Sequence, residues 1–489
     1  MRVTRDRAPA SRGYARADAL QAAEEGSDGE GPPGRQDLTP ARRGTHTPRF
    51  LRKPLARPML RVLGRAAMTL DDQTREEIMA RPRPVRALPV FGASRRADPL
   101  GDARPEDDRW RPVLAVWETT LRCDLACRHC GSRAGVARPD ELSTAECLDL
   151  VRQLAELGTR EVAIIGGEAY LRDDWLDILR AIKAHGMLPT MTTGGRNLTP
   201  ERARDAGAAG LFSASVSIDG DERTHDRLRG VSGSYRCAFE AIANLRGAGV
   251  HVTVNTQINR LSMSHPAHVL DRMIEVGARS WLMQLTVAMG RAADEPDVLL
   301  QPYDLLELFP MLSDLKERAD RARIRLIPGS NVGYFGPYEA QLRGTTRSGH
   351  STGCGAGRAS IGIEADGTIK GCPSLPSAGW AGGNVRETPL AEIWKRATAL
   401  RYTRDRTVKD LWGYCATCYY ADACRAGCTW TTDVLFGRPG NNPYCHHRAL
   451  EMKAAGKRER LVRVEAPPGE PFDHGRFALI VEDDGSPPT

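Results

Sequence analysis

Short apolar runs alternate with amphipathic segments from about residue 112 to residue 321. The six apolar runs read VLAVWET, EVAIIGG, LPTMTTGG, LFSASVSIDG, VHVTVNTQIN and SWLMQLTV. Helical spacing of apolar residues follows them over 143–157, 174–185, 200–208, 234–248, 264–277 and 303–321. Strands that alternate with helices of this length are typical of βα units around a parallel sheet. The pattern predicts an α/β fold, arranged either as an open doubly wound sheet or as a partial barrel.

The repeat occupies only the middle of the chain. Residues 1–108 are rich in Arg and Pro and poor in aromatics, so this basic extension is predicted to be mostly disordered. The repeat predicts a core domain over 109–325, followed by a Gly-rich linker over 326–349. A cysteine-dense region over 350–450 shows little helical periodicity, and we expect metal to staple it. Residues 451–489 are predicted to form a polar, partly ordered tail.

Composition and charge limit the binding partners and the cellular location that can be expected of the chain. The 489-residue chain has a formal net charge of +7, and much of its basic excess lies in the extension. Few aromatics accompany those arginines, which favours a solvated extension over a nucleic-acid-binding arm. The sequence shows neither an apolar run long enough to span a bilayer nor a signal peptide, so a cytoplasmic location is predicted. In that reducing compartment the twelve cysteines are expected to bind metal rather than to form disulfides.

Three cysteines stand in a single loop directly after the first predicted strand. They are Cys123, Cys127 and Cys130. In both sheet arrangements chemistry gathers at the carboxyl ends of the strands, so this loop is a candidate site. Three thiolates can hold three corners of an iron–sulfur cube and leave the fourth iron open to a ligand. A zinc site completed by His129 is the alternative, although zinc loops usually use paired Cys-x-x-Cys hooks.

The spacing Cys-x3-Cys-x2-Cys, with the βα repeat behind it, resembles the radical S-adenosylmethionine (SAM) superfamily over about residues 112–325. The resemblance implies a partial (β/α)6 TIM-like barrel that holds a [4Fe-4S] cluster with an open iron and binds S-adenosyl-L-methionine. It also implies an enzyme, in which the cluster reductively cleaves S-adenosylmethionine and a 5′-deoxyadenosyl radical abstracts hydrogen from a substrate. Cys123, Cys127 and Cys130 are then both cluster ligands and catalytic residues.

Other strand ends match the same family position by position. Gly166, Gly167 and Glu168 stand where the family's Gly-Gly-Glu-Pro segment contacts the methionine amino group of the cofactor, with Ala169 in place of the proline. Arg291 is a candidate for the cofactor carboxylate. The remaining candidates, which match ribose-binding positions or can line the same cavity, are Ser217, Asp219, Thr192–Gly195 and Asn255. A simple turn role is the alternative for a Ser or Asn at a strand end.

Seven further cysteines lie in the cysteine-dense region, and their spacing resembles that of the SPASM domain over about residues 350–450. They are Cys354, Cys372, Cys415, Cys418, Cys424, Cys428 and Cys445. The resemblance implies two auxiliary iron–sulfur clusters of the [4Fe-4S] type. By position, Cys354, Cys372 and Cys428 hold the first cluster, and the other four cysteines hold the second. A zinc knuckle within 415–428 is the alternative.

The first auxiliary cluster lacks one cysteine ligand. Members that ligate it fully have an additional cysteine a few residues upstream of the Cys354 position, and this chain has none between Cys237 and Cys354. His350 is a candidate fourth ligand by proximity, since histidine replaces cysteine in some clusters. An iron open to substrate and an ordinary surface histidine are the alternatives.

The two domains in tandem predict, by family analogy, an enzyme that modifies a ribosomally made peptide or protein. The auxiliary clusters would accept an electron from a substrate radical, which gives a net oxidation such as a crosslink. Expected partners are the precursor peptide or protein, a low-potential electron donor of the flavodoxin or ferredoxin type, and a separate leader-recognition protein. A small-molecule cofactor precursor of the porphyrin kind is the second hypothesis for the substrate. A non-catalytic iron–sulfur or zinc protein is the third hypothesis.

Overall fold

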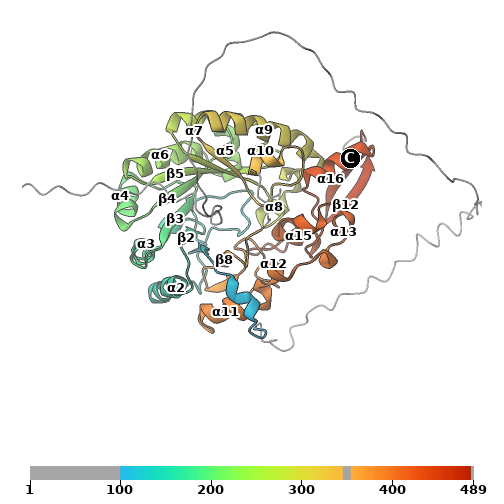
Figure 1. Ribbon diagram of the computed structural model, residues 1–489. Coiled ribbons are helices and arrows are strands. Elements are labelled where there is room, and N and C mark those ends of the chain that lie inside the picture. Colours follow the sequence, from blue (N-terminus) through green and yellow to red (C-terminus); the bar gives the residue numbers. More distant parts are fainter. Residues whose placement is uncertain (1–99, 345–353, 486–489) are drawn as a thin grey trace, which may run out of the picture. The chain divides into compact units, whose positions relative to one another are not determined.

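A ten-stranded sheet lies at the centre of the computed structural model (Figure 1). Its strands are β1 (Leu114–Glu118), β2 (Glu161–Ile165), β3 (Leu188–Thr193), β4 (Ser213–Ser217), β5 (His251–Ile258), β6 (Ser280–Leu285), β7 (Arg325–Pro328), β8 (Ser360–Ile363), β9 (Thr368–Lys370) and β10 (Gly383–Asn384). They follow the order β10-β9-β8-β1-β2-β3-β4-β5-β6-β7. All neighbours from β8 through β7 are parallel, whereas β9 and β10 join antiparallel. The predicted α/β fold with a parallel partial barrel is confirmed.

The structure describes residues 100–344 and 354–485, and these belong to one compact unit, Phe91–Thr489. The prediction of disorder for residues 1–108 therefore falls mostly outside the described residues. Its last part is described and includes the 3-10 helix η1 (Pro105–Arg109). Buried Asp107 forms ion pairs of 2.8 Å with Arg104 and 2.9 Å with Arg401, so this end of the extension packs against the rest of the unit.

The longer helices of the core accompany the parallel strands (Figure 1). They are α2 (Thr144–Glu156), α3 (Trp175–Ala184), α4 (Pro200–Ala209), α5 (Glu222–Arg229), α6 (Ser234–Gly247), α7 (Pro266–Val276) and α9 (Leu305–Arg321). All of them except α5 lie where the apolar spacing predicts a helix. The sequence of α5, ERTHDRLR, has too few apolar residues to show that spacing. Local signals fix some ends, such as the capping box in which Ser143 and Glu146 start α2.

Shorter helices follow β6. They are α8 (Arg291–Asp294), α10 (Glu339–Arg343), α11 (Leu390–Arg396), α12 (Tyr402–Asp405), α13 (Tyr414–Thr417), α14 (Ala421–Cys424), α15 (Thr429–Phe436) and α16 (His446–Ala454). The further 3-10 turns are η2 (Ala169–Leu171), η3 (Pro296–Val298), η4 (Pro302–Asp304), η5 (Thr398–Leu400) and η6 (Val408–Asp410). None of the helices in the described part of the chain is long and apolar enough to cross a membrane.

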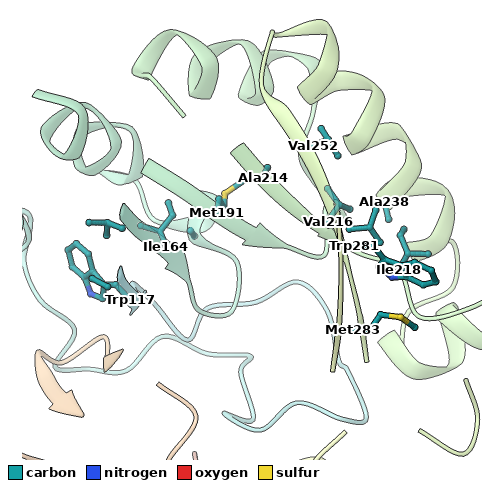
Figure 2. Close-up of a cluster of buried hydrophobic side chains, with 14 of the residues drawn as sticks. Trp117, Ile164, Met191, Ala214, Val216, Ile218, Ala238, Val252, Trp281 and Met283 are labelled. Carbon is teal, nitrogen blue, oxygen red and sulfur yellow. The ribbon is translucent and has the colours of Figure 1, made fainter. Parts of the chain in front are cut away.

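The core lies between the sheet and its helices. Figure 2 shows Trp117 at one end of this layer and Trp281 at the other, and both are fully buried. Trp281 satisfies its indole by donating a 2.8 Å hydrogen bond to the Thr256 hydroxyl. Along β5 the residues alternate between buried and partly exposed, as expected for a strand with one face on the helices. This packing holds the carboxyl ends of the strands, and the loops after them, in fixed positions.

The cysteine-dense region is joined to the core more closely than its predicted boundaries indicate. Strand β8 belongs to that region and pairs in parallel with β1, with Leu114 opposite Ser360. The predicted linker 326–349 begins inside β7. The predicted tail is also structured in its described part, because it forms an antiparallel hairpin of β11 (Lys457–Glu465) and β12 (Arg476–Asp483). The run SIGI of β8 is too short to separate a strand from a loop by pattern alone.

Candidate active site

Cys123, Cys127 and Cys130 line one cavity at the carboxyl end of the parallel sheet, of about 910 Å³ and partly open to solvent. We call it the loop cavity, and the segment 119–135 after β1 the cysteine loop. Burial, the nearby Glu168 carboxylate and the neighbouring thiols raise the pKa of Cys123 to about 12, and burial raises the pKa of Cys127 to about 11. Crowded thiolates of this kind need a cationic group between them, which the irons of a cluster supply.

Two glycines bring the second strand against the cysteine loop. Backbone N–H groups of Gly167 and Glu168 donate to the carbonyls of Thr120 and Arg122 at 2.7 and 2.9 Å. A Cβ on Gly166 would lie 2.2 Å from the Thr120 carbonyl oxygen, and one on Gly167 would lie 2.1 Å from that of Arg122. Only glycine therefore allows the two backbones to approach so closely.

Glu168 is buried at the wall of the loop cavity. Its carboxylate accepts hydrogen bonds from the Thr193 hydroxyl and from the Gly194 N–H, the latter at 2.6 Å. Burial outweighs these bonds and raises the pKa of Glu168 to about 8. A carboxyl in this position suits an ammonium group, which would return it to the charged form.

Several of the predicted strand-end residues meet at the same cavity. Ser217 at the end of β4 and Asn255 in β5 line it, together with Thr192, Thr193 and Gly194. The Asn255 side-chain oxygen is buried with no hydrogen-bond partner among the described residues, so it is free to accept from a bound hydroxyl. Gly195 does not line the cavity. Its φ of +79° turns the chain away, toward α6.

Asp219 and Arg291 lie elsewhere than the sequence led us to expect. Asp219 is fully buried behind the cavity wall, where it pairs with Arg229 at 2.7 Å and faces His129 at 3.5 Å. It therefore orients these two side chains and does not line the loop cavity. Arg291 donates to the carbonyls of Cys127 and Ala134 at 3.2 and 2.6 Å, so its guanidinium holds the cysteine loop in shape.

Arg229 is the cavity residue that sequence reasoning missed. This buried arginine ends α5, lines the loop cavity, pairs with Asp219 and donates toward the Cys127 sulfur at 3.7 Å. Its only advance signal was the run of charged residues after the fourth strand, which reads as an exposed helix face. The guanidinium brings positive charge beside the thiols and to the wall of the cavity.

The downstream cysteines form two groups. Cys415, Cys418, Cys424 and Cys445, the second thiol group, line a single cavity of about 400 Å³. Tyr334, Phe335 and Tyr420 are among the aromatic residues of its wall. Backbone N–H groups of Tyr420 and Asn442 donate toward the Cys418 and Cys415 sulfurs at 3.4 Å. These are the four cysteines that the resemblance to the SPASM domain assigns to the second auxiliary cluster.

Cys354, Cys372 and Cys428, the first thiol group, also come together. Burial and mutual repulsion raise the pKa of Cys354 to about 12 and that of Cys372 to about 11. His350, the candidate fourth ligand, lies outside the described residues. Over 100–344 and 354–485, no three His, Cys, Asp or Glu side chains converge on a position for a single metal ion. His129, which would complete the alternative zinc site, faces Asp219.

Comparison with known proteins agrees with this arrangement. Residues 117–270 match the radical SAM superfamily, and residues 354–419 match SPASM, an iron–sulfur cluster-binding domain. The chain thus has a radical SAM domain followed by a SPASM domain, which agrees with a radical SAM enzyme. The first match begins at the end of β1 and covers the cysteine loop and the Gly166–Glu168 turn, and the second covers all but three of the downstream cysteines.

Relatives of this radical SAM–SPASM enzyme act on different substrates. An AdoMet-dependent heme synthase of Nitratidesulfovibrio vulgaris is 28% identical, over 69% of this chain and 93% of its own. The mycofactocin maturase MftC of Mycobacterium tuberculosis is 29% identical, over 75% of this chain and 89% of its own.

Solved structures share the fold. For anSMEcpe with bound AdoMet the TM-score is 0.56 at 16% identity, over 70% of this chain and 97% of that one. For Streptococcus suis SuiB bound to S-adenosylmethionine the TM-score is 0.53 at 17% identity, over 68% of this chain and 76% of that one. The family implies a [4Fe-4S] cluster and S-adenosylmethionine, and the crowded thiols, Glu168 and the unpartnered Asn255 oxygen fit these groups.

A second pocket of about 710 Å³ adjoins the loop cavity and shares His129, Gly131 and Gln257 with it. Its far wall comes from the SPASM side and includes Ser374, two residues beyond Cys372, and Trp430, two residues beyond Cys428. Phe472 from the loop of the C-terminal hairpin completes it. This adjoining pocket therefore lies between the radical-forming cavity and the first thiol group.

Two carboxyl groups face the adjoining pocket. Glu118 ends β1 and Glu364 follows β8. Behind them, Arg138 pairs with Glu364 at 2.9 Å and lies 3.5 Å from Glu118, while buried Lys370 pairs with Glu364 at 2.6 Å. Glu364 is held ionised by these cations, and its pKa is lowered. Burial instead raises the pKa of Glu118 to about 8, with Glu364 adding to the rise.

Replacing Gly167 by Ala should disturb both fold and cofactor binding. The new Cβ would overlap the Arg122 carbonyl and push Glu168 from its place, at a cost of about 1–3 kcal/mol for overpacking. Thermal denaturation should show the loss of stability, and calorimetry on the reconstituted enzyme should show weaker binding of S-adenosylmethionine.

Gly247→Ala is the matched control, because nothing lies within 4 Å of a Cβ at this last residue of α6. It should leave cofactor binding unchanged and keep or slightly raise stability, by at most about 1 kcal/mol. Equal behaviour of the two variants would contradict the role assigned to the Gly166–Gly167 turn.

Proposed function

We propose that this enzyme oxidises a ribosomally made peptide or protein, such as by forming a crosslink. The observation that carries the proposal is the adjoining pocket, because it presents two carboxyl groups and, among its described lining residues, no lysine or arginine. Such a wall suits amide and other hydrogen-bond-donating groups of a peptide and disfavours a substrate rich in carboxylates. MftC is named as a maturase, and SuiB has been solved with its precursor peptide SuiA, which supports a peptide substrate.

Several residues of the loop cavity have a proposed task. Cys123, Cys127 and Cys130 hold the [4Fe-4S] cluster, and Gly166, Gly167 and Glu168 receive the amino group of S-adenosylmethionine. Ser217 and Asn255 hold ribose hydroxyls, and Arg229 pairs with the cofactor carboxylate. When bound, the cluster and S-adenosylmethionine supply a 5′-deoxyadenosyl radical that takes a hydrogen atom from the substrate.

The rest of the oxidation requires an electron acceptor and a proton acceptor. Cys354, Cys372 and Cys428 would hold a first auxiliary cluster beside the adjoining pocket, and that cluster would supply the electron acceptor for the oxidised substrate. Cys415, Cys418, Cys424 and Cys445 would hold a second cluster, which would supply a further electron carrier. Glu118 faces the pocket and, in its ionised form, accepts the proton that is released.

The proposed reaction takes place in the cytoplasm, where thiols stay reduced. A low-potential donor of the flavodoxin or ferredoxin type reduces the radical-forming cluster. A separate protein recognises the leader of the precursor peptide.

A tetrapyrrole is the second candidate substrate. The observation in its favour is the similarity to AdoMet-dependent heme synthases and to an Fe-coproporphyrin III synthase, at 24 to 29% identity. Coproporphyrins carry several carboxylates, which would meet Glu118 and Glu364 at the described wall of the adjoining pocket.

Incubation with peptides encoded beside the gene tests the proposal. With S-adenosylmethionine and a strong reductant, the reconstituted enzyme should form 5′-deoxyadenosine and a peptide lighter by the hydrogens removed, as measured by mass spectrometry. Cys127→Ala should form neither product while keeping the absorbance of the auxiliary clusters. Turnover of an iron coproporphyrin, with no change in any peptide, would instead favour the second candidate.

Glu118→Gln should separate radical formation from product formation. The amide cannot take up the proton, so product per 5′-deoxyadenosine should fall by about 100-fold, the lower end of the effect typical for a general base. In the parent this ratio should rise as the pH passes about 8, because only the ionised carboxylate, facing Arg138, Lys370 and Glu364, is a base. Quantitation of both products across pH 6 to about 9 gives the ratio.

Glu156→Gln on the exposed face of α2 is the control for this series. It should keep the ratio and the pH profile of the parent. An unchanged ratio in Glu118→Gln would contradict proton acceptance by Glu118.

A further inference from the structure

The first thiol group has a polar neighbour that neither the radical chemistry nor the SPASM motif uses. Tyr402 begins α12, and its hydroxyl is buried with no hydrogen-bond partner among the described residues. Its ring packs edge-on against the ring of Trp380, with the two ring centroids 4.9 Å apart. Buried hydroxyls are nearly always hydrogen-bonded in folded proteins, so an unpaired one points to an acceptor that belongs beside it.

The hydroxyl lies beside the backbone that leads into Cys372. A Cβ on Gly371, the residue before Cys372, would lie 2.8 Å from the ring of Tyr402 and 3.4 Å from its hydroxyl. Glycine at this position therefore lets the phenol lie directly against the chain that carries Cys372.

Burial keeps Tyr402 in its protonated, hydrogen-bond-donating form. Burial raises the pKa of the phenol well above its usual value, and Cys372, Cys354 and Cys428 raise it further, in that order. Buried Arg406 acts in the opposite direction, but it is engaged by the Thr429 hydroxyl and the Arg425 carbonyl. The proton therefore stays on the Tyr402 oxygen and can be donated.

We propose that Tyr402 donates a hydrogen bond to a sulfur of the first auxiliary cluster and thereby raises its reduction potential. A hydrogen bond to sulfur strengthens as the cluster gains negative charge, so it favours the reduced state. In this way Tyr402 would make the first auxiliary cluster a better electron acceptor. The inference rests on the proposed assignment of this cluster to Cys354, Cys372 and Cys428, and it does not depend on the identity of the substrate.

Redox titration of the auxiliary clusters tests the inference without any substrate. The full chain with Cys123, Cys127 and Cys130 all replaced by Ala retains only the auxiliary clusters, and electron paramagnetic resonance follows their reduction. In this background Tyr402→Phe should disfavour reduction of one cluster by about tenfold, which corresponds to a potential about 59 mV lower for a one-electron couple. The other cluster should keep its potential.

Tyr414→Phe is the matched control. The Tyr414 hydroxyl already donates a hydrogen bond to the Glu451 carboxylate, and the Tyr414 ring lines the cavity of the second thiol group. The potential that shifts in Tyr402→Phe should stay unchanged in this control. Electron–nuclear double resonance should also show that one solvent-exchangeable proton coupled to the reduced cluster is lost in Tyr402→Phe and kept in Tyr414→Phe.

A second variant covers the case in which Tyr402→Phe loses iron. 3-Fluorotyrosine in place of Tyr402 keeps the hydroxyl but makes it a stronger donor, so it should raise the same potential. Unchanged potentials in the phenylalanine and fluorotyrosine variants, or equal shifts of both clusters, would overturn the inference. Iron for only one cluster in the triple-alanine background would overturn the ligand assignment itself, and the inference with it.

Discussion

The close packing of two backbones, the Gly166–Gly167 turn and residues 120–122, is the constraint on which the radical-forming site depends. Two hydrogen bonds join them, and no side chain larger than hydrogen fits between. Through this contact Glu168 and the cysteine loop share one rigid position at the ends of two neighbouring strands. Arg291 braces the same loop from its other side through the Cys127 and Ala134 carbonyls.

The charges of the site are divided between its two cavities. Around the loop cavity, buried Asp219 holds Arg229 beside Cys127, so positive charge lies next to the thiols. At the adjoining pocket the order is reversed, because the carboxyl groups of Glu118 and Glu364 face inward and the cations lie behind them. The two cavities therefore present opposite electrostatic environments only a few residues apart, one suited to the cofactor carboxylate and the other to the proposed peptide substrate.

Motif and periodicity predict most of the fold and part of the site. Six strands and six helices lie where the apolar pattern places them, and the predicted cysteine groups come together in space. The positions of Asp219 and Arg291 could not be read in the same way, because a strand-end residue can face the cavity or the layer behind it. The sequence around Arg229 indicated an exposed helix face, since its burial depends on pairing with Asp219 across the sheet end. Glu118 likewise ends an ordinary strand pattern. Its burial could not be predicted, because it depends on β8 and the residues beside it, which are distant in the sequence.

The pairing of β8 with β1 has a consequence for how the two domains depend on each other. Strand β1 leads into the cysteine loop, and β8 leads through β9 to Cys372. The proposed sites of radical formation and of electron acceptance are thus attached to adjacent strands of one hydrogen-bonded ladder, which fixes their separation. A chain ending before β8 would also leave β1 as an unprotected sheet edge, the kind of surface that recruits other strands. The SPASM region is therefore a structural part of the barrel as well as an addition to its chemistry.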